Sequence, residues 1–298
     1  GIGLFLVGES KSTEHLVSTA AKSGFACRIT DTESFEDGEQ IKIVAIWRPF
    51  AKAKKIHLPT VTSTSTELLS SNWPIGSSLS SDYQTKGHGR RGRRWDNAGE
   101  VFACSWKIGK SFEIQPNILQ LICGFIVKQS LQQYNQSPHS IQVIQKWPND
   151  ILLKQDDNVG KVCGVLIESI SKGNVSETVI GIGINLSKSE NMPVYEMPAS
   201  FADSLNKEIN RQILQSEIDC RLAGLFDESP NIPKANFLDF TKLASKSINE
   251  GFTVPKYLLY RNKNVSFHSV NSEGLVIVCD QKNQQILCDD GESLKWDF

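Results

Sequence analysis

One short stretch, residues 83–95 (YQTKGHGRRGRRW), concentrates positive charge in a chain of 298 residues whose formal net charge is −1. Within positions 86–95, five residues are Lys or Arg, one is His and three are Gly. Glycine lets the backbone approach an anion closely, and arginine supplies a planar cation with several donors. The stretch therefore suits a phosphate or a carboxylate. From the loop alone, a nuclear-localisation signal or a nonspecific nucleic-acid patch explains the charge equally well.

Three later segments also combine reactive side chains with unusual local geometry. In KWPND (146–150), Trp and Pro rigidify a turn that presents Asn149 and Asp150 at a strand junction. GKVCGVLIE places Lys161 at the start of a buried strand, where an isolated lysine more commonly extends its amine to solvent. GIGIN places Asn185 after glycines that admit a flat ligand, or simply in a turn. None of these segments is diagnostic alone.

In this order, YQTKGHGRRGRRW, KWPNDILL, GKVCGVLIE and VIGIGIN resemble the motifs of the biotin–protein ligases. The resemblance covers about residues 60–190 by motif and residues 200–298 by pattern. The usual loop of that family is GRGRRGR-W, so His88 stands where an arginine is usual. The resemblance implies that the carboxylate of biotin attacks the α-phosphorus of MgATP, giving biotinyl-5′-AMP. A lysine of a biotin carboxyl carrier domain of a carboxylase then attacks this mixed anhydride.

The resemblance also implies roles for individual residues. Lys161 and Arg90 are the catalytic candidates, because fixed cations must cancel the repulsion between a carboxylate and a polyanionic nucleotide. Biotin is expected to contact Ser63, Thr64, Ser65, Gln84, Gly87, His88, Arg90, Trp95, Lys161, Gly181 and Gly183. The nucleotide is expected to contact Arg90, Arg91, Arg93, Trp95, Lys146, Asn149, Asp150 and Asn185. The expected ligands are ATP, Mg²⁺ and the substrate biotin, with Asp150 as the candidate metal ligand.

Strands and helices must position these groups. Residues 61–72 predict a strand end followed by a helix, so Ser63 and Thr64 can cap that helix as well as contact the ureido group of biotin. Residues 116–134 carry apolar side chains at helical spacing, with one broad buried face and Pro116 in the first turn. Residues 51–60 are expected to be a polar connection. The other expected elements are helices at 13–23 and 212–226, and strands at 2–7, 25–30, 41–47, 77–84, 101–108, 141–147, 151–154, 161–170 and 179–186.

These elements predict an α/β (α+β) fold with a central mixed β-sheet and helices on one face, as in a class II synthetase-like biotin/lipoate ligase domain. After Gly251 the pattern changes to five short strand segments, which predict a small β-barrel. The family resemblance implies that this barrel is SH3-like. We therefore expect three units. They are a small N-terminal β/α extension of unknown role (1–56), a biotin/ATP catalytic domain (57–248) and a C-terminal SH3-like β domain (249–298).

Composition narrows the partners and the compartment. The seven cysteines form no CxxC pair, which favours reduced, mostly buried thiols in a cytoplasmic protein. No apolar run approaches the length of a membrane span, so no membrane partner is expected. The pattern of residues 1–56 lacks the three helices of a winged helix, so DNA is not an expected partner either. The sequence leaves the oligomeric state and the identity of the acceptor carboxylase open.

Two other functions remain as alternatives. A lipoate–protein ligase has a related fold and uses the same adenylate chemistry, but we expect it to lack the arginine-rich loop. A nucleic-acid-binding module would use the basic loop directly, and its binding would weaken steeply with salt. For the biotin ligase, mutual repulsion of the loop cations predicts that residues 86–94 are mobile when the site is empty and ordered by biotinyl-5′-AMP.

Overall fold

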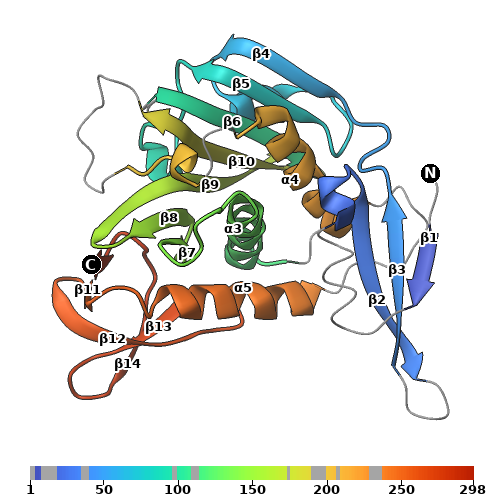
Figure 1. Cartoon of the computed structure of the whole chain (residues 1–298). Coiled ribbons are helices and arrows are strands. Elements are labelled where there is room, and N and C mark those ends of the chain that lie inside the picture. Colours follow the sequence, from blue (N-terminus) through green and yellow to red (C-terminus); the bar gives the residue numbers. More distant parts are fainter. Residues whose placement is uncertain are drawn as a thin grey trace.

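The computed structural model describes residues 4–7, 19–34, 40–95, 99–108, 114–172, 175–188, 199–205, 209–227 and 237–298. Three β-sheets lie in this part of the chain, and helices join and cover them (Figure 1). The N-terminal sheet is antiparallel with the strand order β1-β3-β2, formed by β1 (Leu4–Val7), β2 (Ala26–Ser34) and β3 (Gln40–Trp47). Residues 19–22 of the expected first helix are helical, and residues 13–18 lie outside the described ranges.

The central sheet has seven strands in the order β4-β5-β6-β10-β9-β8-β7. Only β4 and β5 run parallel, and every other neighbouring pair is antiparallel, so the predicted mixed sheet is confirmed. The strands are β4 (Lys55–Val61), β5 (Ser78–Gln84), β6 (Gly99–Ile108), β7 (Ile141–Lys146), β8 (Asp150–Gln155), β9 (Asn158–Lys172) and β10 (Val175–Lys188).

Strand β4 corrects the expectation that residues 51–60 are a connection. It forms one edge of the central sheet, and most of its side chains are exposed. Pro59 has no N–H to donate. It has no pairing partner in the β4–β5 ladder, where Leu58 pairs with Ser81 and Thr60 pairs with Tyr83. Edge strands tolerate both proline and charge. The polar composition of this segment, which is typical of an exposed edge strand, therefore led to the wrong prediction of a connection.

Helices cover both faces of the central sheet, so the expectation of helices on one face was wrong. Neighbouring residues on a strand point to opposite faces. On β6, Ser105 contacts Thr64 of α2, whereas Trp106 donates a hydrogen bond to Asp219 of α4. The helices are α2 (Thr64–Ser70), α3 (Pro116–Gln132), α4 (Arg211–Phe226) and α5 (Phe237–Gly251). Within the described ranges, no helix is long and apolar enough to cross a bilayer.

Helix α3 forms the centre of the core. It packs against the central sheet and is also covered by α4 and α5, so it is buried on more than the one face that its sequence predicts. Its polar side chains have partners there: Gln120 donates to the Val165 carbonyl oxygen at 3.0 Å, and Lys128 donates to the Ser247 hydroxyl at 3.0 Å. The buried thiols of Cys104, Cys123 and Cys163 surround this core as expected, and burial raises the pKa of each.

The C-terminal strands form an antiparallel sheet in the order β14-β13-β12-β11-β15, consistent with the predicted SH3-like domain. Its core includes Phe252 stacked on Phe267, with ring centroids 4.1 Å apart. Trp147 donates its indole N–H to the Gly274 carbonyl oxygen at 3.0 Å, which ties the KWPND turn to this sheet. The strands are β11 (Tyr257–Tyr260), β12 (Lys263–Val270), β13 (Val276–Cys279), β14 (Gln285–Leu287) and β15 (Leu294–Asp297).

The N-terminal sheet lies beside α4 (Figure 1), and buried polar contacts join it to the end of this helix. Trp47 and the backbone N–H of Phe50 both donate to one carboxylate oxygen of Asp227, at 2.9 and 2.7 Å. Arg28 donates to the carbonyl oxygens of Gly224 and Asp227, at 2.7 and 2.9 Å, and its guanidinium lies 5.2 Å from the Trp47 ring centroid. A cation that satisfies the last carbonyls of a helix also complements its dipole.

Candidate active site

A cleft of about 690 Å³ opens at the junction of the central and C-terminal sheets. Its volume lies within the range typical of small-molecule sites. The predicted site residues line it, except for Gly87, Arg91 and Asn185. Residues that are far apart in the sequence, from Ser63 to Gly183, therefore surround one space.

One end of the cleft is lined by neutral hydroxyl and amide groups. Ser63 caps α2, as predicted, by accepting the Thr66 N–H. The side chain of Gln84 accepts hydrogen bonds from the backbone and the hydroxyl of Thr64, at 2.8 and 3.1 Å. Ser105 continues the chain of hydroxyls, lying 2.8 Å from the Thr64 hydroxyl and 3.0 Å from that of Ser65. This end suits a compact polar ligand that both donates and accepts hydrogen bonds.

The basic loop, residues 86–95, folds as a small hairpin over the cleft. Gly89 N–H donates to the Arg93 carbonyl oxygen at 2.7 Å, and Trp95 N–H donates to the Gly87 carbonyl oxygen at 2.9 Å. At the tip, Arg91 has a φ of 57° and Gly92 has a φ of 72°. This tight tip directs the arginines to different sides. Arg90 and Arg93 line the cleft, whereas Arg91 does not.

Close contacts explain two of the glycines that the sequence singled out. The floor of the cleft is β10, where a Cβ atom on Gly183 would lie 2.7 Å from the indole of Trp95. A Cβ atom on Gly181 would lie 2.6 Å from the hydroxyl oxygen of Ser65. Any side chain at either position would displace a residue of the site. The GIGIN motif therefore provides a flat floor under Trp95.

Cationic groups lie in the middle of the cleft. The Lys161 ammonium is 2.7 Å from the Asp150 carboxylate and 5.3 Å from the Trp95 ring centroid. Lys146 is almost completely buried, with its ammonium 5.8 Å from the Trp296 ring centroid. Burial lowers the pKa of Lys146, although the charge of Asp150 acts in the opposite direction. The two lysines and Asp150 thus form a partly buried charged group, where electrostatic forces are stronger than at the open surface.

Two predicted asparagines hold backbone segments in place. Asn149 donates to the Val165 carbonyl oxygen at 3.2 Å, which fixes the KWPND turn to β9. Asn185 donates to the Lys161 carbonyl oxygen at 3.1 Å and does not line the cleft. The geometry gives Asn185 an indirect role, because it holds the backbone of Lys161.

A magnesium site made only of protein ligands does not fit this cleft. Among the described residues, no group of three or more His, Cys, Asp or Glu side chains is arranged to hold a metal ion. Asp150, the predicted ligand, is an isolated carboxylate paired with Lys161. Protein-bound Mg²⁺ commonly uses one or two carboxylates together with substrate phosphates. Asp150 therefore fits only an ion that enters with a nucleotide.

Sequence reasoning missed residues that the fold brings to the cleft from elsewhere. Ser105 is fully buried on β6 and has no motif around it. The C-terminal sheet also contributes to the lining, through Gly291, Glu292, Leu294, Lys295 and Trp296. For these C-terminal residues the sequence did contain a signal, because the acidic DDGE run at 289–292 is opposite in charge to the basic loop.

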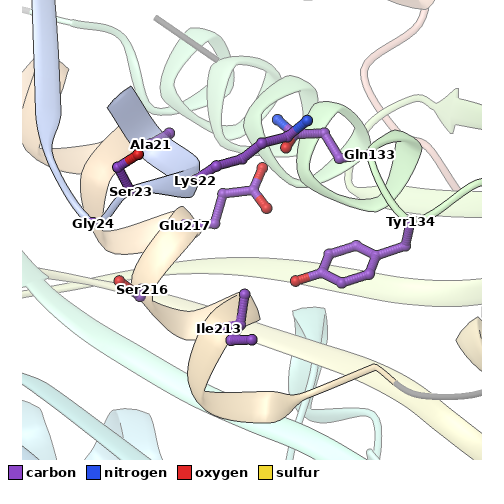
Figure 2. Close-up of a pocket in the computed structure, with 9 residues that line it drawn as sticks. All are labelled: Ala21, Lys22, Ser23, Gly24, Gln133, Tyr134, Ile213, Ser216 and Glu217. Carbon is purple, nitrogen blue, oxygen red and sulfur yellow. The ribbon is translucent and has the colours of Figure 1, made fainter. Parts of the chain in front are cut away.

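A second cavity, of about 340 Å³, lies between residues 21–24, the end of α3 and helix α4 (Figure 2). None of the predicted site residues lines it. Glu217 faces it, and burial raises the pKa of this carboxyl group. Arg221 pairs with Glu217 at 3.2 Å, so the buried charge already has a partner within the protein. We therefore interpret this cavity as a packing gap between residues 21–24 of the N-terminal unit and helices α3 and α4.

The sequence model of the Biotin/lipoate A/B protein ligase family matches residues 57–185. That range contains the hydroxyl end, the basic loop, the KWPND turn, Lys161 and the glycine floor. The chain contains a domain of the biotin/lipoate protein ligase family. The resemblance drawn from the motifs is confirmed.

The chain is similar to several named biotin–protein ligases. Over 204 residues the chain is 30% identical to the bifunctional ligase/repressor BirA of Bacillus subtilis, covering 67% of this chain and 56% of the relative. Over 137 residues it is 31% identical to BirA of Escherichia coli, covering 43% of this chain and 39% of the relative. The chain thus spans about half or less of the length of these relatives.

A solved structure resembles the chain over most of its length. The biotin protein ligase of Aquifex aeolicus, in complex with biotin and ATP, has a TM-score of 0.57 and 25% identity. The match covers 82% of this chain and 99% of that one. The likeness therefore extends well beyond residues 57–185 but does not cover the whole chain.

Proposed function

We propose that this chain is a biotin–protein ligase. It uses ATP to activate biotin as biotinyl-5′-AMP and transfers the biotinyl group to a lysine of a biotin carboxyl carrier domain. The observation that carries this proposal is the position of Lys161, in the cleft between Trp95 of the basic loop and Asp150 of the KWPND turn. The Aquifex aeolicus relative, solved with both biotin and ATP, supports the same pair of small molecules.

The two ends of the cleft match the two parts of such an intermediate. The hydroxyl and amide groups around Thr64 suit the ureido group of biotin, which both donates and accepts hydrogen bonds. Arg90, Arg93 and Lys161 suit the carboxylate and the phosphates. Trp95 lies beside Lys161 and can cover the ligand from the loop side. Asp150 would hold the Mg²⁺ that enters with ATP, which neutralises phosphate charge.

The first chemical step joins two anions. A carboxylate oxygen of biotin forms a bond to the α-phosphorus of ATP, while the bond from that phosphorus to the bridging oxygen breaks and pyrophosphate leaves. Negative charge develops on the oxygens around the phosphorus. Fixed cations stabilise this charge without having to reorganise, and Lys161 and Arg90 provide them. The pairing with Asp150 keeps the Lys161 ammonium in one place before substrate binds.

The second step consumes the mixed anhydride. The neutral amine of the acceptor lysine attacks the biotinyl carbonyl carbon, the bond to the phosphate oxygen breaks, and AMP leaves as the amide forms. The attacking nitrogen loses a proton to solvent. A loop that closes over the intermediate also protects it from water until the acceptor arrives.

Replacement of Lys161 tests the proposal. We expect Lys161→Ala to fold normally and to lower biotin-dependent exchange of pyrophosphate into ATP about 100-fold, because one cation aimed at developing charge contributes about 3 kcal/mol. Lys188 is an exposed lysine on β10, so Lys188→Ala is the matched control and should retain full pyrophosphate exchange. Near-normal exchange in Lys161→Ala would remove Lys161 from the catalytic role.

The two alternatives make different predictions. A lipoate–protein ligase would support exchange with lipoate in place of biotin. A nucleic-acid-binding module needs its loop cations available, yet Arg91 and Arg93 pair with acidic residues of the C-terminal sheet and His88 pairs with Glu168. Those pairs favour a loop that serves the cleft over one that serves an extended polyanion.

The same proposal includes the organisation of the chain. The boundaries proposed at 56/57 and 248/249 lie near the start of β4 and the end of α5. We propose a cytoplasmic enzyme that binds no DNA, although the relatives in Escherichia coli and Bacillus subtilis are named ligase/repressors. An electrophoretic mobility assay, with and without biotin plus ATP, checks the DNA prediction.

A further inference from the structure

The turn between β14 and β15 faces the basic loop with opposite charge. This acidic turn, residues 289–293, comes from the C-terminal sheet, about 200 residues away in the sequence. Arg91 pairs with Asp290 at 3.1 Å and with Glu292 at 3.5 Å. Arg93 pairs with Glu292 at 2.9 Å. Four charged groups thus form one connected network across the mouth of the cleft.

The acidic turn is held by contacts that do not involve the basic loop. One carboxylate oxygen of Asp290 accepts the Glu292 N–H at 3.0 Å, and the other accepts the Ser293 hydroxyl at 3.0 Å. Gly291 lies against Pro148 of the KWPND turn, where a Cβ atom would come within 2.5 Å of the proline ring. The Asp290 carboxylate is therefore fixed in direction, and the turn is fixed in place beside the cleft.

The loop is shaped to use these carboxylates. Because Arg91 has a positive φ at the tip of the hairpin, it turns away from the cleft toward Asp290, while its neighbour Arg90 lines the cleft. Fixing Arg91 from outside thus fixes the direction of Arg90 inside. The network also offsets the mutual repulsion of the loop cations, which considered alone would open the loop.

We propose that Asp290 and Glu292 are positioning residues that hold the basic loop over the cleft and so retain the activated intermediate. This inference rests on the proposed function, since it deepens the account of the same site. The partners are partly exposed, with side-chain exposures of 19–58%. Individual pairs of this kind are weak, so the network can hold the loop without preventing it from opening for the acceptor lysine.

The first measurement does not depend on catalysis. Hydrogen–deuterium exchange of residues 86–95 is followed in the protein without substrates, where the Gly89, Arg93 and Trp95 amides report the hairpin. We expect the double variant Asp290→Asn/Glu292→Gln to raise exchange of this segment about fivefold, the effect of a weak ion-pair network. Asp280→Asn is the matched control, because Asp280 caps the neighbouring turn by accepting the Lys282 and Gln284 N–H groups at 2.8 and 2.9 Å.

The second measurement follows the intermediate. The rate at which preformed biotinyl-5′-AMP leaves the protein should rise about fivefold in the double variant, with bystander lysines labelled in proportion. Arg91→Gln should have the same effect, and adding it to the double variant should have little further effect, because the changes break one network. A KM for biotin that stays within about twofold of wild type would separate retention from substrate binding.

The outcomes separate the inference from the proposed function. If wild-type protein forms no biotinyl-5′-AMP, the proposed function fails, while the exchange experiment still reports the contact between turn and loop. If the intermediate forms but the double variant exchanges and releases it as wild type does, the acidic turn does not position the loop. Faster exchange with unchanged release, or an equal effect of Asp280→Asn, would also overturn the inference.

Discussion

Both small sheets are attached to the rest of the fold through acidic side chains, but in opposite surroundings. At the N-terminal sheet, the Asp227 carboxylate is buried and accepts hydrogen bonds from the Trp47 indole and the Phe50 backbone. At the C-terminal sheet, Asp290 and Glu292 meet guanidinium groups at the protein surface. A polar contact is strong, and costly to break, where water is excluded. In water it is weak and reversible, so the first contact is suited to permanent attachment and the second to a moving loop.

Among the variants of these two contacts, Asp227→Ala should cause the largest loss of stability. The substitution leaves two buried donors without an acceptor, so the free energy of unfolding should fall by about 3 kcal/mol. Urea denaturation measures it. The surface variant Glu273→Ala should change stability by less than about 0.5 kcal/mol, and Asp290→Asn by less than about 1 kcal/mol. Equal losses for Asp227→Ala and Asp290→Asn would erase the distinction.

Salt provides the next largest contrast. Raising NaCl from about 0.05 M to about 1 M shortens the screening length from over 10 Å to about 3 Å. Tryptic cleavage at the arginines of the basic loop should then become several-fold faster in the absence of ligand, while biotin plus MgATP should suppress it at either salt concentration. The destabilisation caused by Asp227→Ala should hardly change across the same range. Salt-independent cleavage would mean that the ion pairs do not hold the loop.

The pH dependence of the loop gives the smallest effect. The hydrogen bond to Glu168, at 3.0 Å, raises the pKa of His88 above its usual value of about 6.5, while the second ring nitrogen lies 3.3 Å from the Lys86 carbonyl oxygen. The imidazolium contact is therefore fully present below about pH 6.5 and is lost as the pH rises through the raised pKa. An NMR titration of His88 should show its midpoint move down in Glu168→Gln. An unchanged midpoint would exclude this ion pair.

Local patterns were sufficient to predict most of the central sheet and the cleft motifs. Short apolar runs predicted β6, β7 and β9, and the hydroxyls before α2 predicted its cap at Ser63. Each of these signals lies within a short window, where strand or helix periodicity and capping are visible. The motif positions then came together because adjacent antiparallel strands bring their residues to one sheet surface.

The remaining features depend on contacts between distant segments. Strand β4 is polar because it lies at an edge, and α3 is covered on a second side only because α5 packs on it. Glu292 and Trp296 reach the cleft because the C-terminal sheet docks there, which no local window reveals. The basic loop illustrates the limit most clearly: its repulsion was visible in the sequence, but the carboxylates that offset it lie about 200 residues away.

The most direct test of the central claim is detection of the intermediate itself. The protein is incubated with biotin and MgATP, then denatured, and the released nucleotides are identified by mass spectrometry. We predict biotinyl-5′-AMP in amounts comparable to the enzyme in wild type, almost none in Lys161→Ala, and no lipoyl adenylate when lipoate replaces biotin. A lipoyl adenylate, or the absence of any adenylate from folded wild-type protein, would contradict the account.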